Sequence, residues 1–572
     1  MISNKEVVQR LLEIFSHKGI EQVIVSPGSR NAPLVQTFKG MGNFEMYSVP
    51  DERTAGFLAL GMAMRLRRPV VLTCTSGSAL LNYGPAIAEA YYQNIPLIVL
   101  SADRPAYLID QGHGQSIRQN EVFRNYIKAS LDIEETSSRE AWYFDSKINE
   151  VLAHTSGEDE GPVHINLHLE EPLYEFVKAK PARARTINYP IFEKSLQTGT
   201  MTRLRKVWTD SQKVMILVGQ HPPRHRLNAW LKHMSTQKNI VILSEHTSNV
   251  KGDFFRVNHI DRCIFPLNQA EWERYQPDLL ITFGKEIVSK KIKNVLLRST
   301  GFDHWHVGKN VDHRDTFGAL TEILRIPPDR FLEGIREFGT KKPDYQNIWK
   351  MRVENAENIH RHYIAGAQWS DLKAWHFLSR HVPTPLVFHL GNSATVRYSL
   401  LFDLPQEIDF YSNRGVSGIE GCTSTSLGFA LQENEVPVWL VCGDLTFLYD
   451  LNAFWQTPIP KSYKIIVLNN RGGGIFRFIE GPLQSSVADP FLETPHQESV
   501  LTAIRNPEIE CFSVNNYTEL QEIFPKFAKT PRMAVLEINT PRMQNDQILK
   551  AYFEKLKTKH ENPDLEKDSS AQ

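Results

Sequence analysis

The chain has 572 residues, more than one hydrophobic core can serve, because single cores stop growing at roughly 250–300 residues. With 41% hydrophobic and 23% charged residues the composition is that of a folded globular protein, which excludes an intrinsically disordered chain. The 65 basic and 65 acidic residues balance, so no net charge attracts nucleic acid or anionic lipid. Several folded domains are expected, without a nucleic-acid partner.

Cysteine usage and the N-terminal residues both indicate a cytoplasmic protein. The five cysteines are odd in number and widely scattered, without the C-x-x-C spacing of zinc or redox sites. Ser3 and Glu6 have the spacing of a capping box before a helix, and no export signal is visible. The uncharged stretch 69–88 is interrupted by Thr, Ser, Asn, Gly and Pro, so it predicts a buried strand, loop and helix and not a membrane span.

The first third of the chain, residues 1–180, alternates helical and extended patterns. An amphipathic helix with Val7, Leu11, Leu12 and Phe15 comes first, followed by apolar runs at 23–25, 70–74 and 97–100. Continuous apolar runs between helices are typical of parallel strands that are buried on both faces. This first unit is therefore predicted to be α/β with a parallel sheet.

Two further α/β units are predicted after Pro-containing or polar linkers at 178–185 and 339–345. The middle unit, residues 190–340, has apolar runs at 214–218, 240–243 and 279–283. The third unit, residues 355–556, has them at 386–390, 438–442, 465–468 and 534–538, and residues 557–572 form a polar tail. The fold class is α/β, with three doubly wound parallel-sheet domains.

Polar residues follow two strands of the third unit. Asp444 comes after the run 438–442, and Asn470 comes 26 residues later, after the run 465–468. That separation allows one helical crossover, which would bring both side chains to the carboxyl ends of neighbouring strands, where α/β sheets bind ligands. Carboxylate and amide oxygens suit Mg²⁺. Each residue alone is more often a helix cap or a turn residue.

Taken together, these motifs resemble the thiamin-diphosphate enzymes, which have G-D-G and then N-N, although Leu445 here replaces the last glycine. G-D-L is characteristic of one branch, the 2-succinyl-5-enolpyruvyl-6-hydroxy-3-cyclohexene-1-carboxylate synthases of menaquinone biosynthesis, and the resemblance extends from about residue 3 to 550. Its most specific stretches are S-P-G-S-R (26–30), D-E-R (51–53), S-A-D-R-P (101–105), G-Q-S-I-R-Q (114–119), G-N-S-A-T-V-R (391–397), S-N-R-G-V-S-G-I-E-G (412–421), G-D-L (443–445) and N-N-R-G-G-G-I-F (469–476).

The resemblance implies thiamin diphosphate as cofactor, with Mg²⁺ or Mn²⁺ bound by Asp444, Asn470 and the Gly472 carbonyl. Glu52 would be the catalytic residue. A carboxyl group hydrogen-bonded to the pyrimidine nitrogen of the cofactor favours the imino tautomer, which removes the thiazolium proton. Without the resemblance, Glu52 would be interpreted as a solvated acid in a first helical turn. The other cofactor contacts implied are Ile419, Gly443, Leu445, Ile475 and Phe476; the apolar members also suit ordinary core packing.

The resemblance also implies the substrates, 2-oxoglutarate and isochorismate, and decarboxylation of the first followed by conjugate addition to the second. Both substrates carry two carboxylates, for which arginine offers a planar bidentate donor. The resemblance supplies these substrate contacts, from all three units: Ser29, Arg30, Arg104, Gln115, Lys290, Ser393, Arg397, Arg414 and Phe476. Taken singly, such cations are most often solvated surface charges. Homodimers with shared active sites, paired into a homotetramer, are implied as well.

The sequence departs from the family pattern at two positions and also suits two other functions. Lys291 stands where the family often has arginine, and Gly114 where it often has asparagine, which weakens the substrate contacts expected there. An acetolactate-synthase-like enzyme and a non-catalytic nucleotide-binding or regulatory module are the competing functions. His360 and His362 are predicted to be surface residues, and His304 and His306 packing residues of a strand.

Overall fold

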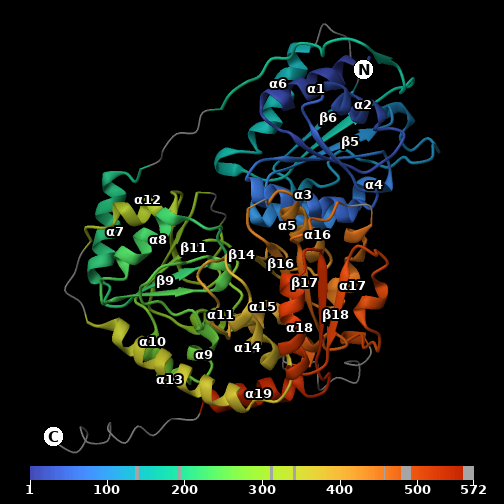
Figure 1. Cartoon of the computed structure of the whole chain (residues 1–572). Helices are drawn as coiled ribbons and strands as arrows, with labels where there is room; N and C mark the ends of the chain where they lie inside the picture. The colour runs from blue at the N-terminus through green and yellow to red at the C-terminus, as the bar shows by residue number, and fades with distance from the viewer. Residues whose placement is uncertain are drawn as a thin grey trace, which may run out of the picture.

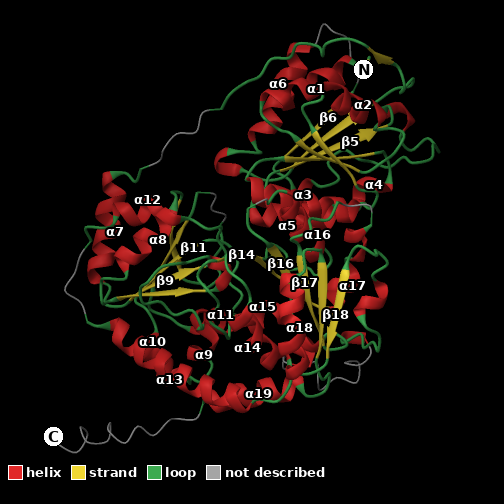
Figure 2. Ribbon diagram, viewed as in Figure 1, coloured by secondary structure: helices red, strands yellow, loops and turns green. Residues whose placement is uncertain are grey.

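The computed structural model describes residues 1–134, 141–189, 195–309, 313–338, 343–433, 435–455, 458–477 and 491–557. Three parallel sheets dominate the fold, each lying among helices (Figures 1 and 2). The predicted fold class, α/β with doubly wound parallel sheets, is confirmed for the described residues. Where the three units are divided stays a prediction.

The first sheet has six parallel strands in the order β3-β2-β4-β5-β7-β6. Its strands are β2 (Gln22–Val25), β3 (Glu45–Ser48), β4 (Val70–Cys74), β5 (Leu97–Asp103), β6 (Ala129–Ile133) and β7 (Val163–His168). Its helices are α1 (Glu6–His17), α2 (Ala32–Met41), α3 (Glu52–Leu66), α4 (Ser78–Leu81), α5 (Gly84–Gln93) and α6 (Ala141–Ala153). Alternate residues of β5 belong to two different core clusters, as expected for a strand buried on both faces.

The third sheet repeats the topology of the first, in the order β15-β14-β16-β17-β19-β18. Its strands are β14 (Leu386–Leu390), β15 (Ile408–Tyr411), β16 (Val438–Gly443), β17 (Lys464–Asn469), β18 (Glu510–Val514) and β19 (Ala534–Asn539). Its helices are α14 (Asp371–His381), α15 (Ala394–Ser399), α16 (Cys422–Leu431), α17 (Asp444–Tyr449), α18 (Tyr517–Lys529) and α19 (Asn545–Leu556).

The middle sheet has five described parallel strands in the order β10-β9-β11-β12-β13. These are β9 (Val214–Val218), β10 (Ile240–Ser244), β11 (Leu279–Phe283), β12 (Asp303–Val307) and β13 (Leu320–Leu324). The helices around it are α7 (Thr198–Asp210), α8 (His225–Met234), α9 (Ile260–Ile264), α10 (Gln269–Tyr275), α11 (Lys290–Arg298) and α12 (Pro328–Gly334). The long helix α13 (Tyr345–Gly366) then leads to the third sheet and packs on α19 (Figure 1).

The remaining described elements are short. The two-residue strands β1 (Ile2–Ser3) and β8 (Phe176–Val177) pair antiparallel. The described 3₁₀ turns are η1 (Ala106–Leu108), η2 (Arg124–Tyr126), η4 (Gly157–Asp159), η5 (His246–Ser248), η6 (Leu451–Phe454), η7 (Gly474–Arg477) and η10 (Val500–Ala503).

The first and third units meet where α3 packs against α16, with α5 packed against α3 (Figure 1). One core cluster continues from the first sheet through these helices into the third. Two glycines allow the helices this close approach. A Cβ on Gly61 would lie 1.9 Å from the Thr425 carbonyl oxygen, and one on Gly428 would lie 2.1 Å from the Leu58 carbonyl oxygen. The position of α3, and of Glu52 at its start, is therefore set by the third unit.

Two local predictions are wrong, and a third concerns residues that lie almost wholly outside the described part of the chain. Ser3 is not a helix cap, because its pairing with Phe176 keeps it extended, and Lys5 precedes α1 instead. His360 is not on the surface; it is 6% exposed because α13 packs on α19, where its ring hydrogen-bonds to the Tyr552 hydroxyl. Of the predicted tail, only Lys557 is described.

Other local predictions are confirmed. Residues 69–88 form β4, α4 and the start of α5, and among the described residues no helix has the length and apolarity needed to cross a membrane. His304 packs in β12, where its ring hydrogen-bonds to the Thr282 hydroxyl at 2.8 Å. His362 is exposed.

Candidate active site

Asp444 lies at the carboxyl end of β16, as the first residue of α17, and is only 2% exposed. One of its carboxylate oxygens accepts the backbone N–H of Leu445 at 2.8 Å. The other accepts the backbone N–H of Gly472 at 2.8 Å and bonds to the His496 ring at 2.9 Å. Asp444 thus links the end of β16 to the loop after β17.

Asn470 lies on that loop, directly after β17, and its side-chain amide is oriented by a neighbouring carboxylate. The amide nitrogen donates to Asp371 at 3.0 Å, and the amide oxygen is buried without a hydrogen-bond partner among the described residues. A buried polar atom without a partner is costly, which makes this oxygen a fitting ligand for a divalent cation. The Gly472 carbonyl, the third predicted ligand, accepts the N–H of Gly474 at 2.9 Å and has a second lone pair available.

Asp444 and Asn470 line a cavity of about 480 Å³ between the middle and third units. Four cations lie in its wall: Lys290 and Lys293 from α11, Arg397 from α15, and Arg414. Lys293 pairs with Glu286 at 2.5 Å, and Arg414 donates to Asn392 at 2.9 Å. The buried Nε of Arg414 has no partner among the described residues. Burial lowers the pKa of Arg397, and the nearby Arg414 lowers it further.

The same cavity collects every predicted cofactor contact except Glu52. These are Ile419, Gly443, Asp444, Leu445, Asn470, Gly472, Ile475 and Phe476, and Ser393 lies beside them. Ser393 precedes α15 with φ +71° and ψ −125°, a backbone conformation that residues with a side chain rarely adopt. Such strained residues cluster at ligand sites.

The predicted substrate contacts of the first unit form a separate group at the carboxyl edge of the first sheet. Arg30 follows β2 and is 5% exposed; it donates to the Leu169 carbonyl at 3.0 Å and to Glu171 at 3.2 Å. Arg104 follows β5 and donates to the Gly114 carbonyl at 2.9 Å, while Ser29 and Gln115 are exposed. Among the described residues that line the 480 Å³ cavity, none comes from this unit.

Buried polar side chains hold the Arg104 loop in place. Asp103 accepts the backbone N–H of Arg104 at 2.7 Å, and the His168 ring hydrogen-bonds to the Arg104 carbonyl. His168 also bonds to Asp132 at 3.1 Å. Burial alone would lower the pKa of His168, but the bonds to Asp132 and the Arg104 carbonyl outweigh it and raise the pKa to about 9. This edge of the first sheet therefore carries a charged hydrogen-bond network.

Glu52 begins α3 and is half-buried. Burial raises the pKa of its carboxyl group, and Asn82 donates to it at 3.4 Å. The residues on either side bond to the third unit of the same chain: Asn452 donates to Asp51 at 2.6 Å, and Arg53 donates to the Tyr449 carbonyl at 2.7 Å. Tyr449 is the last residue of α17 and Asn452 follows it, whereas Asp444 begins that helix.

Comparison with known proteins identifies the family. Residues 5–122 match the model of the thiamine pyrophosphate enzyme N-terminal TPP binding domain. The chain is 38% identical, over 96% of its length and 98% of the relative's, to 2-succinyl-5-enolpyruvyl-6-hydroxy-3-cyclohexene-1-carboxylate synthase from Flavobacterium psychrophilum. It is 37% identical, over 96% and 97%, to the protein of that name from Porphyromonas gingivalis. The chain belongs to the 2-succinyl-5-enolpyruvyl-6-hydroxy-3-cyclohexene-1-carboxylate synthase family.

The fold of this synthase family member also resembles that of a solved thiamin-diphosphate enzyme. Benzoylformate decarboxylase from Polynucleobacter necessarius superposes with a TM-score of 0.70, over 95% of this chain and 99% of that one. At 16% identity this likeness shows the fold alone. The chain is accordingly a thiamin-diphosphate-dependent enzyme by family.

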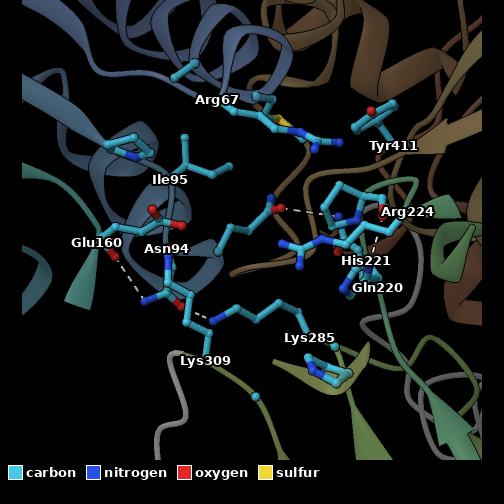
Figure 3. A pocket seen from close by; sticks show the side chains of 18 of the residues that line it. Arg67, Asn94, Ile95, Glu160, Gln220, His221, Arg224, Lys285, Lys309 and Tyr411 are labelled. Carbon is cyan, nitrogen blue, oxygen red and sulfur yellow. Dashed lines mark hydrogen bonds between the residues drawn. The ribbon is translucent and has the colours of Figure 1, made fainter. Parts of the chain in front are cut away.

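A second cavity, of about 270 Å³, lies at the junction of all three units in this synthase family member (Figure 3). Its wall includes Arg67, Arg224, Lys285 and Lys309, with Glu160 among them. Burial raises the pKa of Glu160, although the positive charges of Lys309, Arg224 and Lys285 lower it. The described lining contains none of the residues predicted for the active site.

Sequence reasoning did not find Asp371 and His496, which bond to Asn470 and Asp444. Asp371 begins α14, 99 residues before Asn470, and His496 lies outside any regular element. Neither belongs to a motif with chemical meaning, so only the folded chain reveals their place. Of the two departures from the synthase family, Lys291 places its ammonium group over the Phe265 and Phe553 rings, and Gly114 is exposed.

Proposed function

We propose that the chain decarboxylates 2-oxoglutarate and adds the resulting succinyl carbanion equivalent to isochorismate, a step of menaquinone biosynthesis. One observation carries the proposal: in a single cavity, the oxygens of Asp444 and Asn470 lie with the cations Lys290, Arg397 and Arg414. A metal-bound diphosphate needs the oxygens, and dicarboxylate substrates need the cations. The relatives from Flavobacterium psychrophilum and Porphyromonas gingivalis carry the name of the matching synthase.

The residues around Asp444 would hold thiamin diphosphate through Mg²⁺ or Mn²⁺. The metal ligands would be one Asp444 carboxylate oxygen, the buried Asn470 amide oxygen and the Gly472 carbonyl. This set is supported by the amide oxygen, which has no hydrogen-bond partner among the described residues. Ile419, Leu445, Ile475 and Phe476 supply apolar surface, and Gly443 leaves room beside the metal ligands. When bound, the cofactor supplies the nucleophilic carbon and accepts the electrons released with CO₂.

The cations of the pocket would orient the substrates and compensate their charge. Arg397 and Arg414 can each bind a carboxylate through two parallel N–H groups, and Lys290 provides a third positive charge. Ser393 and Phe476 lie beside them. Ser29, Arg30, Arg104 and Gln115 would add substrate contacts on the side of the site that the first unit provides.

Glu52 would reach this pocket from the partner subunit. The lining of the pocket, as far as the described residues show it, lacks any residue of the first unit, and a completed site then needs the first unit of another copy. We therefore propose homodimers that share their active sites and pair into homotetramers. There Glu52 would hydrogen-bond to the cofactor, and burial, which raises the pKa of its carboxyl group, favours the protonated form that can donate this bond. A cytoplasmic location is proposed because all five cysteines are free.

Product analysis tests this function. Purified protein is incubated with thiamin diphosphate, Mg²⁺, isochorismate and either 2-oxoglutarate or pyruvate, while CO₂ release and the product mass are followed. We expect CO₂ and the succinyl adduct from 2-oxoglutarate only. Release from pyruvate instead would indicate an acetolactate-synthase-like enzyme, and failure to bind thiamin diphosphate would indicate a non-catalytic module.

A further inference from the structure

Glu245 is a buried carboxylate of the middle unit that makes an unusual pair of bonds. It follows β10 directly and is 4% exposed. One carboxylate oxygen accepts the backbone N–H of Val288 and the other that of Ser289, both at 2.7 Å. Burial raises the pKa of Glu245 to about 7, although both N–H groups lower it. Burying a carboxylate costs several kcal/mol, so stabilisation of the fold is a weak reason for its presence.

The segment that Glu245 holds forms part of the wall of the active-site cavity. Val288 lines the cavity, and Lys290, two residues later, is the first residue of α11. Ser289 fixes the start of that helix: its hydroxyl oxygen accepts the Ile292 N–H at 3.2 Å, while the hydroxyl group donates to Asp261. A shift of this backbone would therefore move the Lys290 side chain.

The same segment also positions a second cation. The Val288 carbonyl accepts a hydrogen bond from Arg397 at 3.2 Å, although Arg397 belongs to α15 of the third unit. Figure 1 shows α11 and α15 at the junction of the middle and third units. One dipeptide, Val288–Ser289, thus bonds to Glu245 through its N–H groups and to Arg397 through a carbonyl.

We propose that Glu245 is a positioning residue of the substrate pocket, which fixes Val288 and Ser289 and so places the charged groups of Lys290 and Arg397. This inference rests on the proposed function, in which these cations bind a dicarboxylate. It gives the middle unit a part in substrate binding, through a residue that does not itself line the described cavity.

The test compares Glu245→Gln with Asp278→Asn. The glutamine keeps the size of the side chain but offers one acceptor oxygen in place of two, so one N–H bond is lost. Asp278 is the control: one of its carboxylate oxygens accepts the backbone N–H groups of Gln212 and Lys213 at 2.7 and 2.8 Å, at the opposite end of the same sheet. Asp278→Asn removes the charge of a carboxylate bonded to backbone N–H groups away from the pocket, and its amide oxygen can still accept both bonds.

We expect Glu245→Gln to raise the KM for 2-oxoglutarate on the order of 10-fold, because losing a hydrogen bond to a charged group has an effect of this size. The expected kcat and thiamin diphosphate affinity stay within about twofold of wild type, because the cofactor contacts lie elsewhere. Hydrogen exchange should quicken in the peptide containing Val288 and Ser289. Asp278→Asn should change neither the KM nor that exchange.

A KM for Glu245→Gln equal to that of Asp278→Asn would overturn the proposal, as would unchanged exchange at Val288 and Ser289. If Glu245→Gln does not fold, Glu245→Asp, which retains the charge on a shorter side chain, is measured in the same way. Wild-type protein without CO₂ release from 2-oxoglutarate would instead overturn the proposed function, and the exchange result would still decide the role of Glu245.

Discussion

The first and third sheets have the same strand order, but different side chains follow corresponding strands. After β16 and β17 the third sheet carries Asp444 and Asn470, whose oxygens face a cavity. After β5, which corresponds to β17, the first sheet carries Arg104, held by Asp103 and His168. Corresponding edges of the same topology thus carry carboxylate and amide oxygens in one unit and arginine side chains in the other.

The sheet determines where a site lies, and the residues of the loops determine its chemistry. In both units the carboxyl ends of neighbouring parallel strands bring distant loops together. What the loops then bind depends on charge: oxygens suit a divalent cation, and arginines suit carboxylates. A dicarboxylate substrate and a metal-bound diphosphate need both kinds of edge.

The largest expected effect comes from Glu52→Gln. This change removes the proposed catalytic carboxyl group of the first unit and leaves the proposed cofactor contacts of the third unit unchanged. Turnover should fall roughly 100- to 10,000-fold, the usual contribution of a positioned acid or base. Mg²⁺-dependent binding of thiamin diphosphate, measured by titration calorimetry, should stay near the wild-type value because Asp444 and Asn470 remain. Near-normal turnover would remove Glu52 from the chemistry.

A smaller loss is expected from Arg397→Ala, which tests whether the cations of the cavity bind substrate. The kcat/KM for 2-oxoglutarate should fall roughly 10- to 100-fold, the equivalent of about 1.4–2.8 kcal/mol. Arg67→Ala is the control, since Arg67 lines only the second cavity. Equal kcat/KM values for the two variants would contradict the proposal that the cations of the 480 Å³ cavity bind 2-oxoglutarate.

The contact between the two units can be weakened without touching either site. In Gly61→Ala the added methyl group would lie 1.9 Å from the Thr425 carbonyl oxygen, so α3 and α16 must separate. We expect a loss of about 1–3 kcal/mol in the free energy of unfolding, measured in urea. Gly84→Ala is the control, because a Cβ there meets nothing within 4 Å. Equal stability of the two variants would contradict the close approach.

The smallest effect concerns the network that holds Arg104. The pKa of His168 is raised from 6.5 to about 9 in the folded protein, so its stabilising contribution is complete below pH 6.5 and is lost as the pH rises through 9. His168→Gln should therefore flatten the fall of the urea midpoint between pH 6.5 and 9. His304→Gln should leave that slope unchanged, because burial lowers the pKa of His304 to about 4. An unchanged slope in His168→Gln would contradict the assigned network.

Most of the sheet framework could be predicted from the sequence because buried parallel strands are continuous apolar runs. β4, β9, β11 and β14 coincide with their predicted ranges. Asp444 and Asn470 could be paired because the chain between them is one crossover long. Contacts between distant segments could not be predicted: nothing in the sequence links Glu245 to Val288, or His360 to Tyr552, since each pair meets only when separate elements pack.

Subunit complementation tests whether one active site takes Glu52 from one copy of the chain and Asp444 from another. Glu52→Gln and Asp444→Asn chains, each inactive alone, are coexpressed with different tags, and the mixed oligomers are purified. A shared site leaves one intact pairing in a mixed dimer, so about a quarter to a half of the wild-type turnover should return. Mixed oligomers as inactive as either parent would contradict an active site shared between subunits.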